Sequence, residues 1–172
     1  MIAFENIFGK TRDKLILILG AGGTGKAVSA YFAAAAHDLE KFFIASRSNA
    51  AIKLSSDLGC NGISWSSINE ILPNVEILIN CTSLGSITEP SQSPISINDL
   101  KQFQSDAIVY DVIYDPNPTQ LLKDADLLGH RTLNGGDMNF EQAVIGFHYA
   151  ATKGALDLNN LDIRNAMKQP GA

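Results

Sequence analysis

The stretch LGAGGTGKAV (19–28) carries three glycines at a spacing that could build a phosphate-binding loop. Gly20, Gly22 and Gly25 match the G-x-G-x-x-G pattern of a dinucleotide-binding turn. The same stretch also matches the G-x-x-x-x-G-K part of a nucleoside-triphosphate loop, with Lys26 as its lysine. The first pattern serves hydride transfer and the second serves phosphoryl transfer, so the surrounding residues must decide.

A triphosphate loop is disfavoured by two residues. Its lysine is normally followed by Ser or Thr, whose hydroxyl binds the magnesium ion, but here Ala27 follows. A second carboxylate for the metal is also expected at the end of a neighbouring apolar strand, and the run ILIN ends instead in the amide of Asn80. The sequence therefore favours a dinucleotide-binding turn over the triphosphate loop of an ATPase.

The dinucleotide reading requires a strand before the first glycine and a helix at the third. The apolar run KLILIL (14–19) predicts the strand, and small and apolar residues at helical spacing predict a helix over 25–36. Gly20 would make the tight turn and Gly22 would let a pyrophosphate approach, while Gly25 would pack the helix against the sheet. The anion would then lie on the helix N-terminus, although the glycines could also serve a purely structural turn.

The same alternation of strands and helices continues along the chain. It predicts an α/β fold, a doubly wound, mostly parallel, Rossmann-like sheet with right-handed crossovers and C-terminal helices, in a single domain spanning 1–172. Residues 82–98 are rich in Ser, Pro and Thr and predict a long irregular connection. Further strands are expected at 41–45, 62–65, 75–81, 107–113 and 130–133, and further helices at 50–58, 67–72, 99–103, 119–128, 138–153 and 158–167.

Composition narrows the class of protein. The net charge is −5 and basic tracts are absent, which argues against a nucleic-acid partner. No apolar run approaches the roughly 18 residues of a membrane span, and the N-terminus lacks a signal-peptide pattern. The two cysteines, Cys60 and Cys81, suit a reducing compartment as inert fillers, so a cytoplasmic location is expected. The three histidines are spaced for neither a metal site nor a triad: His37, His130 and His148.

The end of the second predicted strand indicates which dinucleotide is preferred. An NAD-specific enzyme usually places a carboxylate there on the ribose hydroxyl, but this chain has the sequence ASRS at 45–48. Arg47 can instead pair with a 2′-phosphate, which favours NADP and leaves NAD possible. Alternatively, Arg47 is a solvated loop residue. A second basic residue that would support the 2′-phosphate is expected near Ala51, but only Lys53 lies in that neighbourhood.

Further blocks resemble the C-terminal NADP-binding domain of shikimate dehydrogenases over nearly the whole chain. The most specific spacings are Y-x-P-x-x-T-x-L-L and G-x-x-M-x-x-x-Q, which related dinucleotide-binding domains lack. The blocks that carry the resemblance are GAGGTGKA at 20–27, SRS at 46–48, NCTSLG at 80–85, YDVIYDPNPTQLL at 110–122 and NGGDMNFEQA at 134–143.

The resemblance implies a role for each matched residue. Tyr114 and Gln142 would face the substrate, although Tyr114 could simply pack and Gln142 could be solvated. Met138 would lie along the nicotinamide or be core filler. Asp137 replaces the second glycine of the family's G-x-G-M turn, which could weaken or reposition the cofactor. The implied cofactor-binding residues are Gly20, Gly22, Gly23, Thr24, Gly25, Ser46, Arg47, Ser48, Thr82, Ser83, Val112, Gly135 and Met138.

The implied activity is reversible hydride transfer between NADP and shikimate, with 3-dehydroshikimate as the oxidised partner, in aromatic amino acid biosynthesis. In the family, a Lys and an Asp from an N-terminal substrate domain move the proton, in motifs resembling N-V-T-x-P-x-K and N-T-D. Neither motif occurs here, so no catalytic residue is assigned in this chain. Helices from about 137 onward would pack against that missing substrate domain.

Two interpretations remain open. The chain is either the cofactor half of an NADP-dependent shikimate dehydrogenase, inactive by itself, or a non-catalytic nucleotide-binding or sensing module that lost its substrate domain. The choice of shikimate, quinate or a related substrate would depend largely on the missing domain. The oligomeric state is open.

Overall fold

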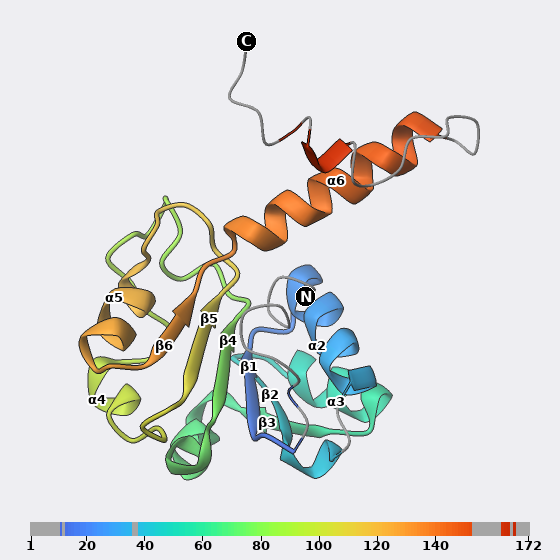
Figure 1. Cartoon of the computed structure of the whole chain (residues 1–172). Coiled ribbons are helices and arrows are strands. Elements are labelled where there is room, and N and C mark those ends of the chain that lie inside the picture. The colour runs from blue at the N-terminus through green and yellow to red at the C-terminus, as the bar shows by residue number, and fades with distance from the viewer. Residues whose placement is uncertain (1–10, 12, 36–37, 153–162, 166, 168–172) are drawn as a thin grey trace. The chain divides into compact units, whose positions relative to one another are not determined.

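The computed structural model describes residues 11, 13–35, 38–152, 163–165 and 167 (Figure 1). It divides into two compact units, Met1–Gly135 and Gly136–Ala172. The first unit holds a sheet with its covering helices, and the second holds α6 (Gly136–Thr152). Most of the helix predicted at 158–167 lies outside the described residues, as does His37.

In the described part of the first unit, six strands form one sheet in the order β3-β2-β1-β4-β5-β6, with every neighbouring pair parallel. This order confirms the predicted doubly wound, Rossmann-like sheet, because it grows outward in both directions from β1 and β4. The strands are β1 (Ile16–Leu19), β2 (Phe42–Ser46), β3 (Asn61–Ser64), β4 (Ile77–Asn80), β5 (Ile108–Asp111) and β6 (Arg131–Leu133).

The helices of the first unit cover both faces of this sheet. In Figure 1, α2 (Gly23–Ala35) and α3 (Ala50–Leu58) lie on one side, and α4 (Ile97–Leu100) and α5 (Gln120–Leu127) lie on the other. Short 3₁₀ turns complete the connections: η1 (Leu39–Lys41), η2 (Trp65–Glu70) and η3 (Leu72–Asn74).

Some predicted boundaries were wrong for identifiable reasons. The helix expected at 67–72 is replaced by η2 and η3, because Pro73 has no N–H and opposes a continuous α-helix. The helix expected at 99–103 begins earlier, since the Ser96 hydroxyl caps it by accepting from the Asp99 N–H at 3.2 Å. The first strand starts two residues after Lys14, where the N–H of Leu15 donates to the Glu76 carboxylate.

The central strands β1 and β4 are buried along their whole length because both of their faces are covered, and all of their residues except Asn80 are apolar. All four residues of β1 are buried, as are all four of β4. Alternate residues of β1 point to opposite faces, so Leu17 and Leu19 join the core cluster that includes Leu100 and Leu121. Continuous apolar runs are the expected pattern for a parallel sheet covered on both sides.

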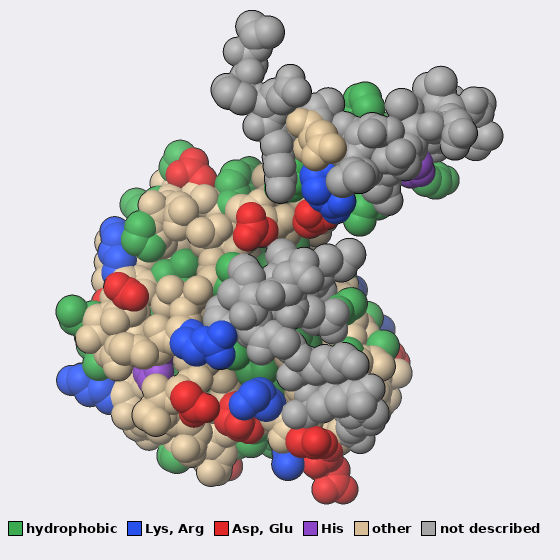
Figure 2. All heavy atoms as spheres, viewed as in Figure 1, with side chains coloured by type: hydrophobic (Ala, Val, Ile, Leu, Met, Phe, Trp, Pro, Cys, Tyr) green, Lys and Arg blue, Asp and Glu red, His purple; other side chains and the backbone are tan. Residues whose placement is uncertain are grey.

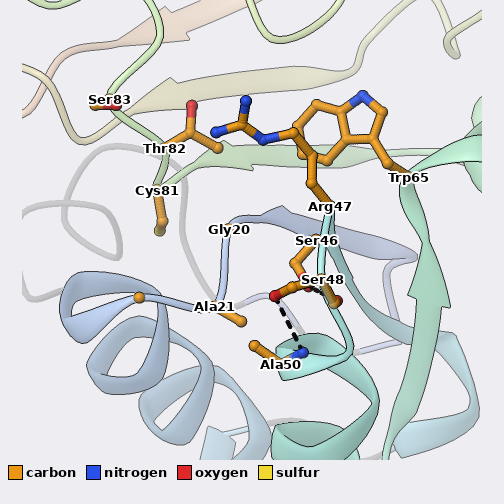
Figure 3. A pocket seen from close by; sticks show the side chains of 11 residues that line it. Gly20, Ala21, Ser46, Arg47, Ser48, Ala50, Trp65, Cys81, Thr82 and Ser83 are labelled. Carbon is orange, nitrogen blue, oxygen red and sulfur yellow. Dashed lines mark hydrogen bonds between the residues drawn. The ribbon is translucent and has the colours of Figure 1, made fainter.

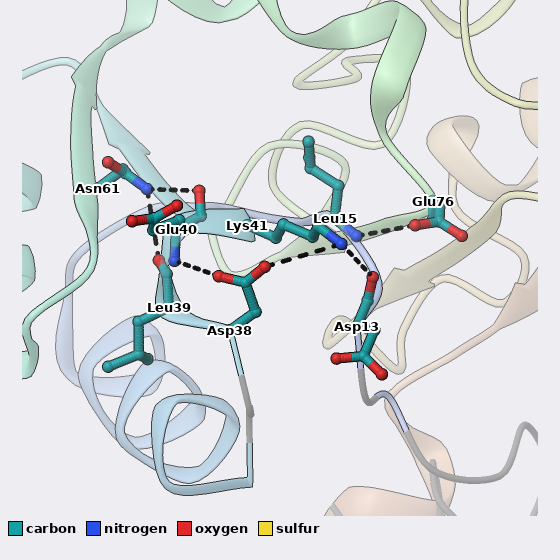
Figure 4. A network of polar contacts seen from close by, with 8 residues as sticks. All are labelled: Asp13, Leu15, Asp38, Leu39, Glu40, Lys41, Asn61 and Glu76. Atoms are coloured by element: carbon teal, nitrogen blue, oxygen red, sulfur yellow. Dashed lines mark hydrogen bonds and ion pairs between the residues drawn. The ribbon is translucent and has the colours of Figure 1, made fainter.

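At the amino ends of the strands, a polar network ties the connections together (Figure 4). Glu76 accepts from both Lys14 Nζ and the Leu15 N–H, each at 2.9 Å. Lys41 donates to the Asp13 carbonyl at 3.3 Å, and the amide of Asn61 donates to the Glu40 carbonyl at 2.8 Å. These exposed and half-exposed contacts join the segments that enter the sheet at the amino ends of its strands, opposite the carboxyl edge where ligands of such sheets bind.

The described surface and the second unit give little information about the kind of partner that the chain binds. On the face drawn in Figure 2, acidic and basic side chains of the described residues lie interspersed. Among the helices that the structure describes, none is long and apolar enough to cross a membrane. Within the second unit, Arg164 forms an ion pair with Glu141 of α6.

Gly62 allows α3 to pack directly against β3, which yields a test of the fold. A Cβ at this position would lie 2.7 Å from Ile52 Cα and 2.9 Å from the Ala51 carbonyl oxygen, both backbone atoms. Gly62→Ala is therefore expected to lower the free energy of unfolding by about 1–3 kcal/mol in urea titrations. The matched control is Gly146→Ala in α6, where a Cβ meets nothing within 4 Å. Equal unfolding curves for the two variants would contradict the close packing.

Candidate functional site

A pocket of about 550 Å³ opens at the carboxyl ends of β1, β2 and β4 (Figure 3). It lies at the switch point of the sheet, where the connections from β1 and β4 run in opposite directions and ligands of open α/β folds bind. Its lining residues come from four separate connections. They are Gly20, Ala21, Gly22, Ser46, Arg47, Ser48, Ala50, Trp65, Cys81, Thr82 and Ser83.

The turn after β1 is possible only with glycine at two of its positions. Gly20 has φ of +101°, a left-handed conformation that other residues rarely adopt. A Cβ at Gly25 would clash with the carbonyl oxygen of Gly20 and lie 2.8 Å from its carbon. Gly25 thus lets the first turn of α2 contact the end of β1, and this contact places the helix N-terminus at the pocket.

The remaining glycines of the turn leave open space at that N-terminus. A Cβ at either Gly22 or Gly23 would meet nothing within 4 Å, and Gly22 lines the pocket. The first N–H groups of a helix have no partner inside the helix, and the helix dipole makes this end positive. No acidic residue occupies the first turn of α2. The turn can therefore receive an anion such as a pyrophosphate.

The connection after β2 presents Arg47 to the same pocket. The buried Ser46 hydroxyl donates to the Ser48 carbonyl and accepts from the Ala51 N–H at 3.0 Å, which shapes the turn and caps the start of α3. Arg47 lies at the exposed apex of this turn and, among the described residues that line the pocket, is the one with a full charge. The pocket thus has a positive charge on one side and a positive helix end on the other.

Cys81 contributes an uncharged side chain to the lining of the pocket. Burial, together with the nearby Asp111 carboxylate, raises the pKa of the Cys81 thiol to about 12. Cys60 is likewise a free thiol whose pKa burial raises to about 11. Both thiols are protonated at neutral pH, so neither is an activated nucleophile.

The turn after β4 is held by a buried hydrogen-bond network. The side-chain oxygen of Asn80 accepts from the Thr82 N–H at 2.9 Å and from the Thr82 hydroxyl at 2.7 Å. The amide of Asn80 donates to Asp111 at 3.0 Å, and the Thr119 hydroxyl donates to the other Asp111 oxygen at 2.8 Å. Since Thr119 also caps α5, one carboxylate joins the pocket wall at Thr82 to the start of a helix.

The Asp111 carboxylate is fully buried, and this burial raises its pKa to about 6. The donors Thr119, Ile113 N–H and Asn80 act in the opposite direction by stabilising the charged form. The carboxylate is therefore mostly ionised at neutral pH, and it accepts three hydrogen bonds that orient the neighbouring polar groups.

The other predicted site residues fall into two sets. Val112 and Gly135 lie together beyond the ends of β5 and β6, where a Cβ at Gly135 would meet the Val112 backbone. Tyr114 also lies beyond the carboxyl end of β5. Its side chain is 56% exposed, and it is not among the residues that line the pocket.

Met138 and Gln142 belong to the second unit and lie four residues apart on α6, hence on the same side of that helix. Asp137 lies in the first turn of α6, where a carboxylate is favourable to the helix dipole. This gives the residue a structural reason to replace glycine. The ligand contacts of Met138, Gln142 and Asp137 stay predictions.

Two features of the site were missed from the sequence. Trp65 lines the pocket although it was placed only at the end of a predicted strand. The Asn80–Asp111 pair was also overlooked, although both residues are polar ends of apolar strands, ILIN and IVYD. Such an ending signals a residue at the carboxyl edge of the sheet, and adjacent strands bring two of them into contact.

Comparison with known proteins gives a consistent result. The family model described as Shikimate / quinate 5-dehydrogenase matches residues 3–109. A shikimate dehydrogenase (NADP(+)) from Rhodopseudomonas palustris is 37% identical over 142 residues, 81% of this chain and 49% of that protein. The chain spans about half the length of the curated relatives that it matches.

Solved structures show the same likeness. A shikimate dehydrogenase in complex with NADP+ has a TM-score of 0.75 and 26% identity, over 96% of this chain and 57% of that chain. A quinate dehydrogenase from Corynebacterium glutamicum in complex with NAD has a TM-score of 0.74 and 25% identity, over 96% and 58%. Because these two proteins hold different nicotinamide cofactors, the preference of this chain must be argued from its own residues.

The buried carboxylate predicts a specific pH dependence of stability. Its pKa rises from 3.8 to about 6 on folding, so the folded state holds the proton more tightly. Stability from this group is present below pH 4 and is lost as pH rises to about 6, by on the order of 2 kcal/mol. Asp111→Asn should remove that loss in urea unfolding between pH 4 and 7.

The matched control is Asp57→Asn, at an exposed position of α3. Because this substitution also removes one carboxylate, but from the surface, it shows how much of any change in the profile comes from the loss of one negative charge alone. A parallel profile for Asp111→Asn would contradict the raised pKa.

Proposed function

Because the chain belongs to the shikimate / quinate 5-dehydrogenase family, we propose that its pocket binds NADP(H) for hydride transfer to and from a shikimate-like hydroxy acid. The observation that carries this proposal is the pairing of an open glycine turn with the single cation Arg47 in one pocket. The turn matches the pyrophosphate that NADP shares with NAD, and Arg47 matches the 2′-phosphate that distinguishes NADP from NAD. The activity is proposed for this chain together with a substrate-binding segment.

The residues that line the pocket are suited to the phosphate groups of an NADP molecule. The pyrophosphate would lie on the N-terminus of α2 over Gly22 and Gly23, and the 2′-phosphate would pair with Arg47. Thr82 and Ser83, held by the Asn80 network, would border the middle of the cofactor. The nicotinamide would extend toward Val112 and Gly135 beyond the ends of β5 and β6, and a contact with Met138 stays a prediction from the family resemblance.

When bound, NADP supplies the hydride acceptor, and the residues of this chain bind and orient it. The pocket lining includes no Lys, His, Asp or Glu, so the described pocket residues offer no general base for the substrate hydroxyl. We assign that proton transfer to the Lys and Asp of a substrate domain, as the family resemblance implies. The family resemblance also implies substrate contacts for Tyr114 and for Gln142, and each of these roles stays a prediction.

The proposed 2′-phosphate contact can be tested at Arg47. Arg47→Ala should weaken NADP+ binding by about 10-fold or more in calorimetric titrations, because a charge-assisted contact is lost. NAD+ binding should stay within about 2-fold, since that cofactor lacks the phosphate. Lys123→Ala, at an exposed position of α5 outside the pocket lining, serves as the control. Unchanged NADP+ affinity in Arg47→Ala would refute the 2′-phosphate assignment.

The proposed pyrophosphate contact can be tested at Gly22. A methyl group there meets no protein atom within 4 Å but enters the space that the pyrophosphate would use. Gly22→Ala should therefore reduce both NADP+ and NAD+ affinity by about 10-fold while leaving the unfolding midpoint unchanged. If the variant keeps full affinity for both nucleotides, the pyrophosphate does not lie on this turn.

A further inference from the structure

Trp65 occupies the position next to Arg47 at the edge of the sheet. β2 and β3 pair in parallel with Ser46 opposite Ser64, so Arg47 and Trp65 are each the first residue beyond a paired end. Both line the same pocket, and Figure 3 shows the guanidinium and the indole extending along the same side of it. The tryptophan is therefore placed one strand farther from the glycine turn than the arginine.

The indole is held in place and is only partly covered. Trp65 is half-buried, and it packs against the core cluster that includes Ile68 and Leu72. The remainder of the side chain faces the pocket. Tryptophan thereby gives the pocket a flat aromatic surface.

The covalent structure of the nucleotide links these positions. With the pyrophosphate on the α2 N-terminus and the 2′-phosphate at Arg47, the base is attached to the ribose carbon next to the phosphorylated one. The base must then lie within one sugar ring of Arg47. On the β3 side of Arg47, Trp65 is the lining residue, and the small side chain of Ala50 lines the same part of the pocket near the start of α3.

We propose that Trp65 and Arg47 form an adenine-binding subsite in which the base stacks on the indole face. This inference rests on the proposed function and adds to it a residue that selects an aromatic base. Stacking of a base on an aromatic side chain, with a guanidinium nearby, is a recurrent and strong mode of nucleotide binding. Trp65 thereby anchors the end of the cofactor that takes no part in the chemistry.

The test uses adenosine 2′,5′-bisphosphate, which carries the base and the 2′-phosphate without the nicotinamide. Trp65→Leu keeps an apolar side chain against the core but loses the aromatic face, and should weaken binding by about 10-fold in calorimetric titrations. Trp65→Phe keeps a smaller aromatic face and should stay within about 3-fold of the wild type. Equal affinity of the wild type and Trp65→Leu would overturn the subsite.

Fluorescence supplies a second readout that needs no variant. Trp65 is the sole tryptophan of the chain, so all tryptophan emission comes from this site. Adenosine 2′,5′-bisphosphate should quench that emission saturably, whereas inorganic pyrophosphate, which has no base, should leave it unchanged. Equal quenching by both probes, or by neither while the bisphosphate binds, would overturn the stacking.

The two proposals fail in different ways. If the wild-type chain binds neither NADP+ nor adenosine 2′,5′-bisphosphate, the proposed function falls and the subsite falls with it. If the wild type binds both and Trp65→Leu binds them equally well, only the adenine subsite is wrong.

Discussion

The contact between Gly25 and the carbonyl of Gly20 is the constraint on which the pocket depends. Any side chain at Gly25 would push the first turn of α2 away from the end of β1. With glycine there, unpaired N–H groups of the helix face the edge of the sheet at its switch point. The parallel neighbours of β1 then add the other two walls, because Arg47 directly follows β2 and Thr82 lies two residues beyond the end of β4.

The pocket wall at Thr82 depends on the buried charge of Asp111. Asp111 is costly to bury, as its raised pKa shows, yet it accepts hydrogen bonds from Asn80, Thr119 and the Ile113 N–H. Through Asn80 it fixes the Thr82 turn, and through Thr119 it fixes the start of α5. A neutral apolar residue would pack at lower cost but would leave the Asn80 amide without this acceptor. The stability that the buried Asp111 charge costs is therefore consistent with a role of this carboxylate in holding the Thr82 turn in one conformation.

The sequence predicted the features that depend on local chemistry. Continuous apolar runs identified the central strands, and the glycine spacing identified the turn and the helix that follows it. Arg47 was assigned from its place at the end of β2, and the structure places it in the pocket. Its contact with a 2′-phosphate stays a prediction, as do the roles of Tyr114 and Gln142.

Features that depend on contacts between strands could not be predicted in the same way. Trp65 reaches the pocket because Ser64 pairs with Ser46, and that register is not visible in either segment alone. The Asn80–Asp111 hydrogen bond likewise needs β4 and β5 to be neighbours in register. Pro73 was a local signal that was overlooked, since it directly follows the helix expected at 67–72 and lies inside the second of the two 3₁₀ turns found there.

The central claim is that one nucleotide spans the glycine turn, the Arg47 turn and the Thr82 turn. The most direct measurement is an amide NMR titration of the chain with NADP+, followed residue by residue. The prediction is that the largest shift changes fall on the backbone amides of Gly22, Gly23, Arg47 and Thr82 and on the indole N–H of Trp65. Saturable shifts confined to other parts of the chain, or no shifts at millimolar NADP+, would contradict the claim.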